Sequence, residues 1–254
     1  EIGGKGLFTE ALEDALRSGE IDLAVHSLKD LPIEESPGLL LAAVLDRVDA
    51  RDVLIAKERH LLSTLPAGAR VGSSSVRRMA QLRAARGDVE VAPLRGNVDT
   101  RVRKALEGAY DAVVLAAAGV LRLGLEGAVR EYLPFEVMLP APGQGALAVQ
   151  CRSEDRSTRE ALELLDDPLT RAATEAERGF LEALGGGCSA PVAAHADLAE
   201  GGNGEVLELT GLVLSPDGAR RVAVRGRAPV SKARSLAARL AKEALARGAG
   251  RCLS

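Results

Sequence analysis

The chain has 254 residues, of which 46% are hydrophobic and 27% are charged, a balance typical of a globular protein with two or three domains. Its net charge of −3 and aromatic content of only 2% argue against nucleic acid or an anionic membrane surface as a partner. The apolar run at 112–121 is shorter than the ~20 residues that cross a bilayer, so no membrane segment is expected.

The three cysteines are far apart and form no CxxC pair, and the three histidines are scattered along the chain. This spacing supports neither a disulfide framework nor a zinc site. We therefore expect no metal ion, no signal peptide and a reducing, cytoplasmic setting.

Helices and strands alternate over the first part of the chain. The first expected elements are a helix over 9–18, with Thr9 as its N-cap and Gly19 as its stop, and a strand over 21–27. Further strands are expected at 69–72, 89–94 and 111–117, and further helices at 74–87, 97–108 and 118–124. This order predicts an α/β fold with a parallel or mixed sheet covered by helices.

The last part of the chain has a different pattern. A helix over 170–187 ends at consecutive glycines, and strands follow at 191–199, 205–214 and 219–228. The connections EGGNG and SPDG have the composition of hairpin turns, and a final amphipathic helix over 231–248 has Ser231 as its expected N-cap. These elements predict a small α+β domain with a three-stranded antiparallel sheet.

Two segments are expected to carry the chain between domains, namely LDRVDARD at 45–52 and the Pro- and Gly-rich LPAPGQGA at 139–146. They predict a discontinuous first domain over 1–46 and 145–165. A second domain over 51–140 is inserted into it, and a C-terminal domain covers 168–254.

Polar residues gather where the expected strands end, at 26–30, 72–78, 94–101 and 116–122. In open α/β sheets, ligands bind at the carboxyl ends of strands, where helix N-termini also point. Between residues 70 and 104, nine Lys or Arg residues stand against three Asp or Glu residues, although the whole chain is acidic. These clusters predict a site for a carboxylate or phosphate group; the alternative for any single arginine is an exposed position on a helix face.

Three single residues each allow two interpretations. Asp30, beside Lys29 at a strand end, is either a catalytic acid or a residue that caps the turn before Pro32. His26 is more simply a structural histidine than a catalytic one. Cys188 follows three glycines, where it is either a small buried residue in a loop or a thiol presented for chemistry.

Seven stretches of the sequence, in order, resemble the porphobilinogen deaminase (hydroxymethylbilane synthase) family. They are GGKGLFTEALEDAL, AVHSLKDLP, GSSSVRRMAQL, LRGNVDTRV, LAAAGVLRLGL, LPAPGQGALAVQCR and ERGFLEALGGGCSAPVAAHA. The resemblance implies two domains of the type II periplasmic-binding-protein fold with a cleft between them, a small C-terminal α+β domain, and a monomeric cytoplasmic enzyme. Members of the family normally begin with a further strand and helix, which we expect to lie outside this sequence.

The implied reaction joins four porphobilinogen molecules head to tail into hydroxymethylbilane and releases ammonia. Its primer is a dipyrromethane cofactor, which the match of GGGCSAP places on Cys188 through a thioether. Asp30 of SLKD matches the catalytic aspartate, which helps to protonate the leaving amine, stabilises the azafulvene cation and assists loss of the pyrrole α-proton.

The other residues implied by the resemblance bind the acetate and propionate groups of the pyrroles, contact the hinge or form a lid. The carboxylate-binding set is Ser27, Lys29, Ser73, Ser75, Arg77, Arg78, Arg95, Arg101 and Arg122. Gln144 and Gly145 match a hinge-side contact, and Lys5 and Phe8 match a mobile lid.

Two other functions are compatible with parts of the sequence. A non-catalytic carboxylate-binding protein would have the same two-domain layout, because a fold does not determine a function, but it has no use for GGGCSAP. A thiol-redox enzyme would use Cys188, but no resolving cysteine lies near it in the sequence.

Overall fold

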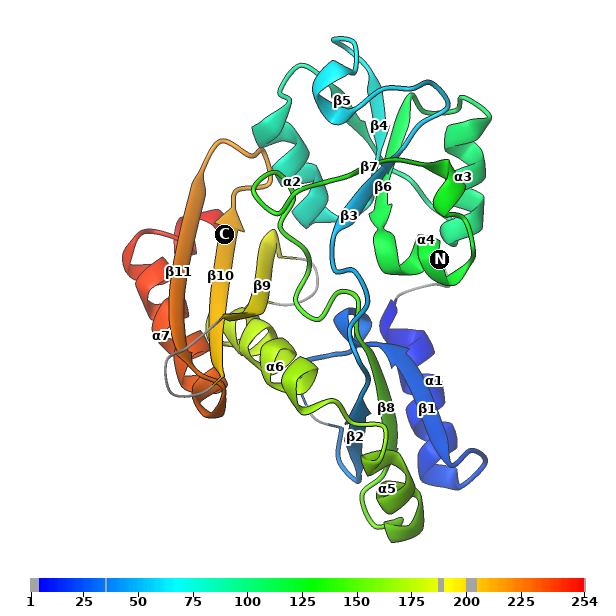
Figure 1. Ribbon diagram of the computed structural model, residues 1–254, viewed down its shortest axis with the longest axis vertical. Coiled ribbons are helices and arrows are strands. Elements are labelled where there is room, and N and C mark those ends of the chain that lie inside the picture. Colours follow the sequence, from blue (N-terminus) through cyan, green and yellow to red (C-terminus); the bar gives the residue numbers. More distant parts are fainter. Residues whose placement is uncertain (1–4, 35, 187–189, 200–204, 254) are drawn as a thin grey trace.

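The computed structural model describes residues 5–34, 36–186, 190–199 and 205–253. Three separate sheets, each with its own helices, meet around a central junction (Figure 1). We call the groups of elements built on these sheets the N-terminal, middle and C-terminal units. The middle unit lies above the N-terminal unit in Figure 1, and the C-terminal unit lies beside both.

The N-terminal unit has a small antiparallel sheet in the order β1-β8-β2. Its strands are β1 (Leu23–Ser27), β8 (Leu147–Arg152) and β2 (Leu39–Val44). Helix α1 (Lys5–Ser18) packs on one face and α5 (Arg156–Glu163) on the other, because successive residues of β8 point to opposite faces. Strand β8 follows the middle unit in the chain, so this unit is built from two separate segments of the sequence.

Two expectations for this unit need correction. Helix α1 begins at Lys5, so Thr9 lies inside the helix and is not its N-cap. The apolar spacing of Phe8, Leu12 and Leu16 already continued the helical repeat upstream of Thr9. Strand β1 is confirmed, but the alternation of apolar Ile21, Leu23 and Val25 along it suggested the wrong buried face: Leu23 and Val25 face outwards, while Ala24 and His26 are buried.

The middle unit has a five-stranded mixed sheet in the order β5-β4-β6-β3-β7. The strands are β5 (Glu90–Ala92), β4 (Arg70–Gly72), β6 (Ala112–Ala116), β3 (Asp52–Ile55) and β7 (Val129–Tyr132). Strands β4, β5 and β6 run parallel, whereas β3 is antiparallel to both β6 and β7. The expected mixed α/β sheet is confirmed.

Three helices of the middle unit begin where strands end. They are α2 (Val76–Ala85), α3 (Val98–Leu106) and α4 (Ala117–Arg122). The side chain of Ser75 caps α2 by accepting the N–H of Arg78, and the side chain of Asn97 caps α3 by accepting the N–H of Thr100. The helix N-termini therefore lie at the same edge of the sheet as the carboxyl ends of β4, β5 and β6.

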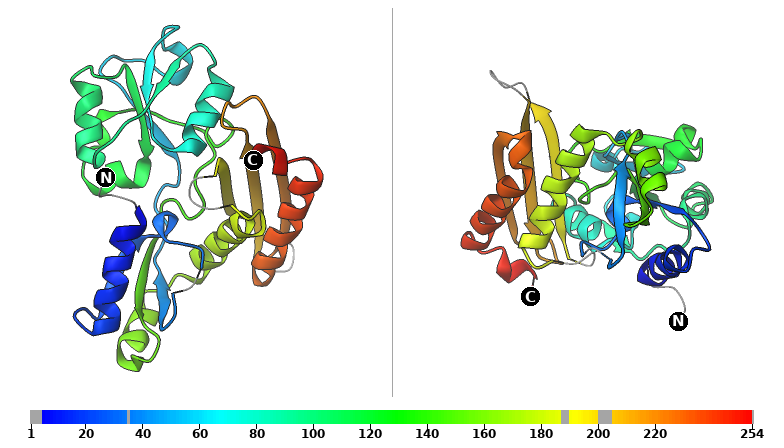
Figure 2. Two further views of the ribbon diagram at one scale, coloured as in Figure 1. Left: turned by 180° about the vertical axis from the view of Figure 1, so that it is seen from behind. Right: turned by 90° about the horizontal axis from the view of Figure 1, so that it is seen from below.

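The C-terminal unit is the expected three-stranded antiparallel sheet, formed by β9 (Val192–Ala199), β10 (Val206–Leu214) and β11 (Arg221–Pro229). Helices α6 (Pro168–Ala183) and α7 (Ala233–Ala246) cover one face, as Figure 2 shows, and a short α8 (Gly250–Leu253) ends the chain. The other face packs on α2 of the middle unit. Ser231 lies in a 3-10 turn, Val230–Lys232, and is not the cap of α7.

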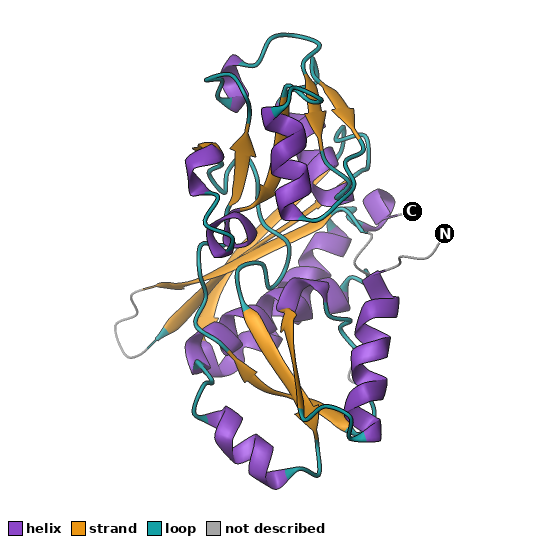
Figure 3. Cartoon of the chain, turned by 90° about the vertical axis from the view of Figure 1, so that its right-hand side faces the viewer, coloured by secondary structure: helices purple, strands orange, loops and turns teal. Residues whose placement is uncertain are grey.

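Two crossings join the N-terminal and middle units, at 45–51 and 139–146 (Figure 3). The limits given above for the three domains stay a prediction. None of the described helices is both long enough and apolar enough to cross a membrane.

Candidate functional site

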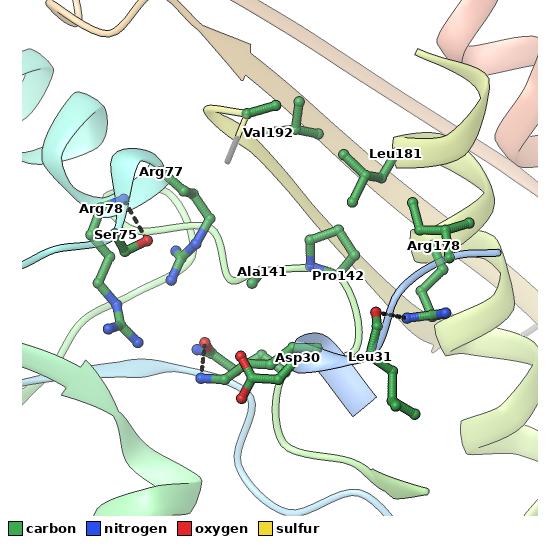
Figure 4. A pocket seen from close by; sticks show the side chains of 14 residues that line it. Asp30, Leu31, Ser75, Arg77, Arg78, Ala141, Pro142, Arg178, Leu181 and Val192 are labelled. Atoms are coloured by element: carbon green, nitrogen blue, oxygen red, sulfur yellow. Dashed lines mark hydrogen bonds between the residues drawn. The ribbon is translucent and has the colours of Figure 1, made fainter. Parts of the chain in front are cut away.

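Two cavities lie where the three units meet, and they share Lys29, Asp30 and Arg78. The cleft cavity, between the N-terminal and middle units, is also lined by Ser27, Val98, Arg101, Leu115, Ala116, Ala118, Gly119, Arg122, Gly145 and Ala146. The junction cavity, shown in Figure 4, reaches the C-terminal unit and is also lined by Leu31, Ile33, Ser75, Arg77, Ala141, Pro142, Gln144, Arg178, Leu181, Ala190 and Val192. The strand ends that carry the polar clusters therefore converge, as expected.

Most of the predicted site residues line one of these cavities, but some do not. Ser73 is 2% exposed and lies behind the site, where its Oγ accepts the N–H of Ser75 at 3.3 Å. Arg95 is exposed and lines neither cavity. Lys5 and Phe8 lie in α1, where their side chains are outside the described part of the structure.

Cys188 itself lies outside the described residues. The other two cysteines are buried in hydrophobic cores, where Cys151 is 0% exposed and Cys252 is 2% exposed. His26 is also buried, and its Nε2 has no hydrogen-bond partner within the described part of the chain. His26 lines neither cavity.

A buried carboxylate outside the predicted set holds the two neighbouring arginines. Asp52, the first residue of β3, is 0% exposed. Its Oδ1 accepts Nε–H and Nη2–H of Arg78 at 3.1 and 2.7 Å, and its Oδ2 accepts Nη2–H of Arg77 at 2.7 Å. Nε2 of Gln144 donates to the same Oδ1 at 2.8 Å. Burial alone would raise the pKa of Asp52, but the charges of Arg77 and Arg78 lower it well below its ordinary value.

Strand β3 is not among the expected strands, and Asp52 ends the segment 45–52 that is expected only to cross between domains. Asp52 pairs with Ala116 across the antiparallel β3–β6 ladder. The start of β3 therefore lies at the same edge of the sheet as the carboxyl ends of the parallel strands. The sequence signal for Asp52 is its place directly before the apolar run VLIA, which suggests that the carboxylate is buried. A buried carboxylate needs a charged partner, so this position also points to a nearby cation.

The two arginines keep donors that Asp52 does not use. Nη1 of Arg77 donates to the carbonyl of Leu139 at 2.5 Å, but its buried Nε has no partner among the described residues. Both guanidinium groups are directed from α2 towards the turn that carries Asp30 (Figure 4). A buried N–H without an acceptor is costly, so the site favours a ligand with carboxylate oxygens.

Lys29 lines both cavities together with Asp30 and Arg78. Its Nζ donates to Oε1 of Gln144 at 3.3 Å. Burial, together with the positive charge of Arg78, lowers the pKa of Lys29 from 10.5 to about 7. The amine therefore loses its proton near neutral pH until an anion arrives to stabilise the charged form.

Binding of a small dicarboxylate at about pH 8 is therefore expected to draw a proton onto Lys29, whose pKa is about 7 in the free protein. Affinity for the dicarboxylate should fall as the pH rises above that value, because a growing share of the protein must first be protonated. Calorimetry in buffers with different heats of ionisation measures this proton uptake. Lys29→Gln should abolish it, and the same binding heat in every buffer with the unmodified protein would contradict the prediction.

A buried carboxylate on helix α6 of the C-terminal unit, that of Glu177, accepts hydrogen bonds from both crossings. Glu177 is 0% exposed and accepts Nη1–H and Nη2–H of Arg47, in the first crossing, at 2.6 and 3.1 Å. It also accepts the N–H of Gly143, in the second crossing, at 2.7 Å and that of Ala196 at 2.8 Å. Burial alone would raise the pKa of Glu177, but Arg47 and His195 lower it to about 2. These contacts set the relative positions of the three units at the site.

Gly145, in the second crossing, lines the cleft cavity and packs closely against the first crossing. Gly145 has φ +94°, and a Cβ there would lie 2.6 Å from the carbonyl oxygen of Val48. Its carbonyl accepts Nη2–H of Arg122 from the middle unit at 3.0 Å. Arg122 therefore reaches across the cleft, and its position depends on a backbone that only glycine can adopt there.

Solved structures of periplasmic solute-binding domains resemble the chain only weakly. A substrate-binding domain of an amino acid ABC transporter from Streptococcus pneumoniae is 13% identical and aligns 69% of this chain with 73% of its own, at a TM-score of 0.39. A likeness at this level supports no conclusion about function.

Sequence relatives are far closer. The porphobilinogen deaminase of Brevibacillus brevis is 47% identical over 100% of this chain and 81% of its own length. Porphobilinogen deaminase 1 of Streptomyces coelicolor is 50% identical over 98% of this chain and 81% of its own. Residues 1–160 match the family model of the porphobilinogen deaminase dipyrromethane cofactor-binding domain, and residues 172–246 match that of the C-terminal domain. The chain therefore belongs to the porphobilinogen deaminase family.

Proposed function

We propose that this chain joins four porphobilinogen molecules head to tail into hydroxymethylbilane, with release of ammonia, and that Asp30 is the catalytic residue. One observation carries the assignment of Asp30: among the described residues that line the cleft and junction cavities, it is the single acidic one. Six cations share the lining with it, namely Lys29, Arg77, Arg78, Arg101, Arg122 and Arg178. One carboxylate is thereby placed between two spaces that each suit an acidic ligand.

The residues present fit a dipyrromethane, whose pyrroles each carry an acetate and a propionate. On the junction side, Ser75, Arg77 and Arg78 would hold these groups, and the unpartnered Nε of Arg77 would gain an acceptor. On the cleft side, Ser27, Arg101 and Arg122 would hold the carboxylates of an incoming porphobilinogen. When bound, the dipyrromethane supplies the primer pyrrole to which new units are added.

We propose Cys188 as the attachment point, through a thioether. Arg178 and Leu181, upstream of it on α6, line the junction cavity, and so do Ala190 and Val192, which follow it. Because the chain lines this cavity on both sides of Cys188 in the sequence, a tether there needs little length. The remaining cysteines, Cys151 and Cys252, are buried in hydrophobic cores and do not line the cavity.

The carboxyl group of Asp30 can serve each stage of the condensation at one position. It can help to protonate the amine that leaves as ammonia, and its negative charge then stabilises the cation left on the pyrrole. It can afterwards assist loss of the α-proton from the pyrrole that has attacked. The arginines contribute by holding the carboxylates in place, which keeps the reacting carbons near Asp30.

The mass of the intact protein, made in cells that synthesise porphobilinogen, tests this proposal. Unmodified protein should exceed its sequence mass by a dipyrromethane and should release ammonia from porphobilinogen. Cys188→Ser should have its bare sequence mass and form no hydroxymethylbilane. Cys252→Ala, which changes a buried cysteine in the same unit, should keep the adduct. A bare thiol in active protein would contradict the proposal, as would full activity of Cys188→Ser.

We also propose that the protein acts as a monomer in the cytoplasm and has no nucleic-acid or membrane partner. Its negative net charge of −3 and low aromatic content support the exclusion of nucleic acid. Sedimentation at several protein concentrations tests the monomer. The carboxylate-binding alternative has the likeness of folds as its only support, so we do not pursue it.

A further inference from the structure

The turn that carries Asp30 has little to hold it from within. Leu28–Asp30 form one 3-10 turn between β1 and Pro32, closed by a single bond from the N–H of Leu31 to the carbonyl of Leu28 at 3.3 Å. A turn of this length has poor hydrogen-bond geometry, so contacts from outside the turn help to decide its position.

One residue of the C-terminal unit supplies such contacts. Nη1 of Arg178, on α6, donates to the carbonyls of Leu28 and Leu31, each at 3.1 Å, and its Nη2 donates to that of Pro32 at 2.6 Å. The guanidinium thus contacts the backbone on both sides of Lys29 and Asp30, as Figure 4 shows for Leu31. We propose that Arg178 is a positioning residue, which fixes this turn so that the Asp30 carboxyl group keeps its place in the site.

Contacts of the neighbouring residue hold the part of helix α6 that carries Arg178. The preceding residue, Glu177, is the buried carboxylate that binds Arg47, Gly143 and Ala196. Neighbouring residues of one helix therefore hold the two crossings and the turn of Asp30. A lysine at 178 could not reproduce the contacts fully, because its point charge lacks the planar fork that spans several carbonyls.

The same helix offers a matched control. Arg171 lies two turns earlier on α6, and its Nη2 donates to the carbonyls of Leu41 and Ala42 in β2 at 3.3 and 3.1 Å. Arg171→Gln and Arg178→Gln each remove a guanidinium that bonds α6 to backbone carbonyls of the N-terminal unit. Only Arg178→Gln loosens the turn of Asp30.

The kinetic test compares the two variants as purified holoenzymes, and this part rests on the proposed role of Asp30. Arg178→Gln is expected to lower kcat by about 10- to 100-fold, since a displacement of about 1 Å at a reacting group has an effect of this size. KM for porphobilinogen and the mass of the adduct should change little. Arg171→Gln should keep the kcat of the unmodified protein, and Arg178→Lys should recover part of the loss.

A second readout does not depend on activity. Hydrogen exchange at the amides of residues 28–31 should be faster in Arg178→Gln than in the unmodified protein or Arg171→Gln. Faster exchange with unchanged kcat would show that Arg178 holds the turn but would overturn the link between this contact and catalysis. Equal losses of kcat in both variants, or unchanged exchange in Arg178→Gln, would overturn the positioning role. If Arg178→Gln does not fold, Arg178→Lys gives the same comparison.

Discussion

Replacing Asp30 with asparagine is expected to lower kcat by about 10²- to 10⁴-fold, the range for loss of a positioned acid or base. Asparagine has nearly the size of aspartate, but it has no charge and exchanges no proton at neutral pH. Arg77, Arg78 and Lys29 remain to bind carboxylates, so KM for porphobilinogen and the mass of the attached cofactor should change little. Steady-state kinetics and intact mass measure these quantities.

Glu34 offers the control for Asp30. It lies on the same loop, is exposed, and lines neither the cleft cavity nor the junction cavity. Glu34→Gln removes the same charge from the chain and should leave kcat unchanged. An unchanged kcat in Asp30→Asn would show that Asp30 is not the catalytic residue. An equal loss of kcat in Asp30→Asn and Glu34→Gln would point to a general effect of charge.

Loss of the Asp52 carboxylate is expected to destabilise the fold by about 3–5 kcal/mol in Asp52→Ala, the range for a buried ion pair deprived of one partner. The variant leaves Arg77 and Arg78, which are 4% and 6% exposed, without their counter-charge. Both are also proposed to bind the cofactor, so the fraction of protein carrying the adduct should fall. Urea unfolding followed by circular dichroism, together with intact mass, checks both effects.

Asp49 serves as the comparison, because it is a nearby aspartate with an arginine partner at the surface. Its Oδ2 lies 2.6 Å from Nη2 of Arg51, and the two side chains are 24% and 41% exposed. Solvent screens this pair, so Asp49→Ala should cost no more than about 1 kcal/mol. Similar losses in the two variants would show that burial of the Asp52 pair adds nothing.

The pH dependence of stability gives Asp52 a second signature. Its pKa in the folded protein is lowered from the ordinary 3.8 by Arg77 and Arg78, so the folded state binds its proton less readily. The stabilisation is therefore complete above the unfolded-state value and is lost as the pH falls towards the folded one. Asp52→Asn should show a smaller loss of stability than the unmodified protein between about pH 5 and pH 2.

The C-terminal unit has two roles in this picture of the site. Its sequence includes Cys188, the proposed attachment point, and its helix α6 contacts the crossings through Glu177 and the turn of Asp30 through Arg178. The unit that is proposed to bear the cofactor therefore also positions the backbone of the proposed catalytic residue. Movement of the C-terminal unit relative to the backbone of Asp30 would break these hydrogen bonds.

Part of the local structure was predictable from the sequence, but strands β2, β3, β7 and β8 and helix α5 were not predicted. Strands β4, β6, β9 and β10 and helices α2, α3 and α6 lie where composition and periodicity placed them, because their signals act over a few residues. Ser75 and Asn97 cap their helices through an N–H three residues away. The errors at Thr9 and Ser231 are of the same local kind, since a helix or 3-10 turn continued past a residue that could have capped it.

The sequence alone predicted basic clusters that follow strands and begin helices, and most of the residues it singled out line one of the two cavities. The tertiary structure decided how these side chains are held. Asp52 reaches Arg77 and Arg78 only because β3 runs antiparallel, and Arg178 reaches the turn of Asp30 across about 150 residues of sequence. Partners of buried charges depend on strand direction and on the packing of units, and neither leaves a trace in the residues near the charge.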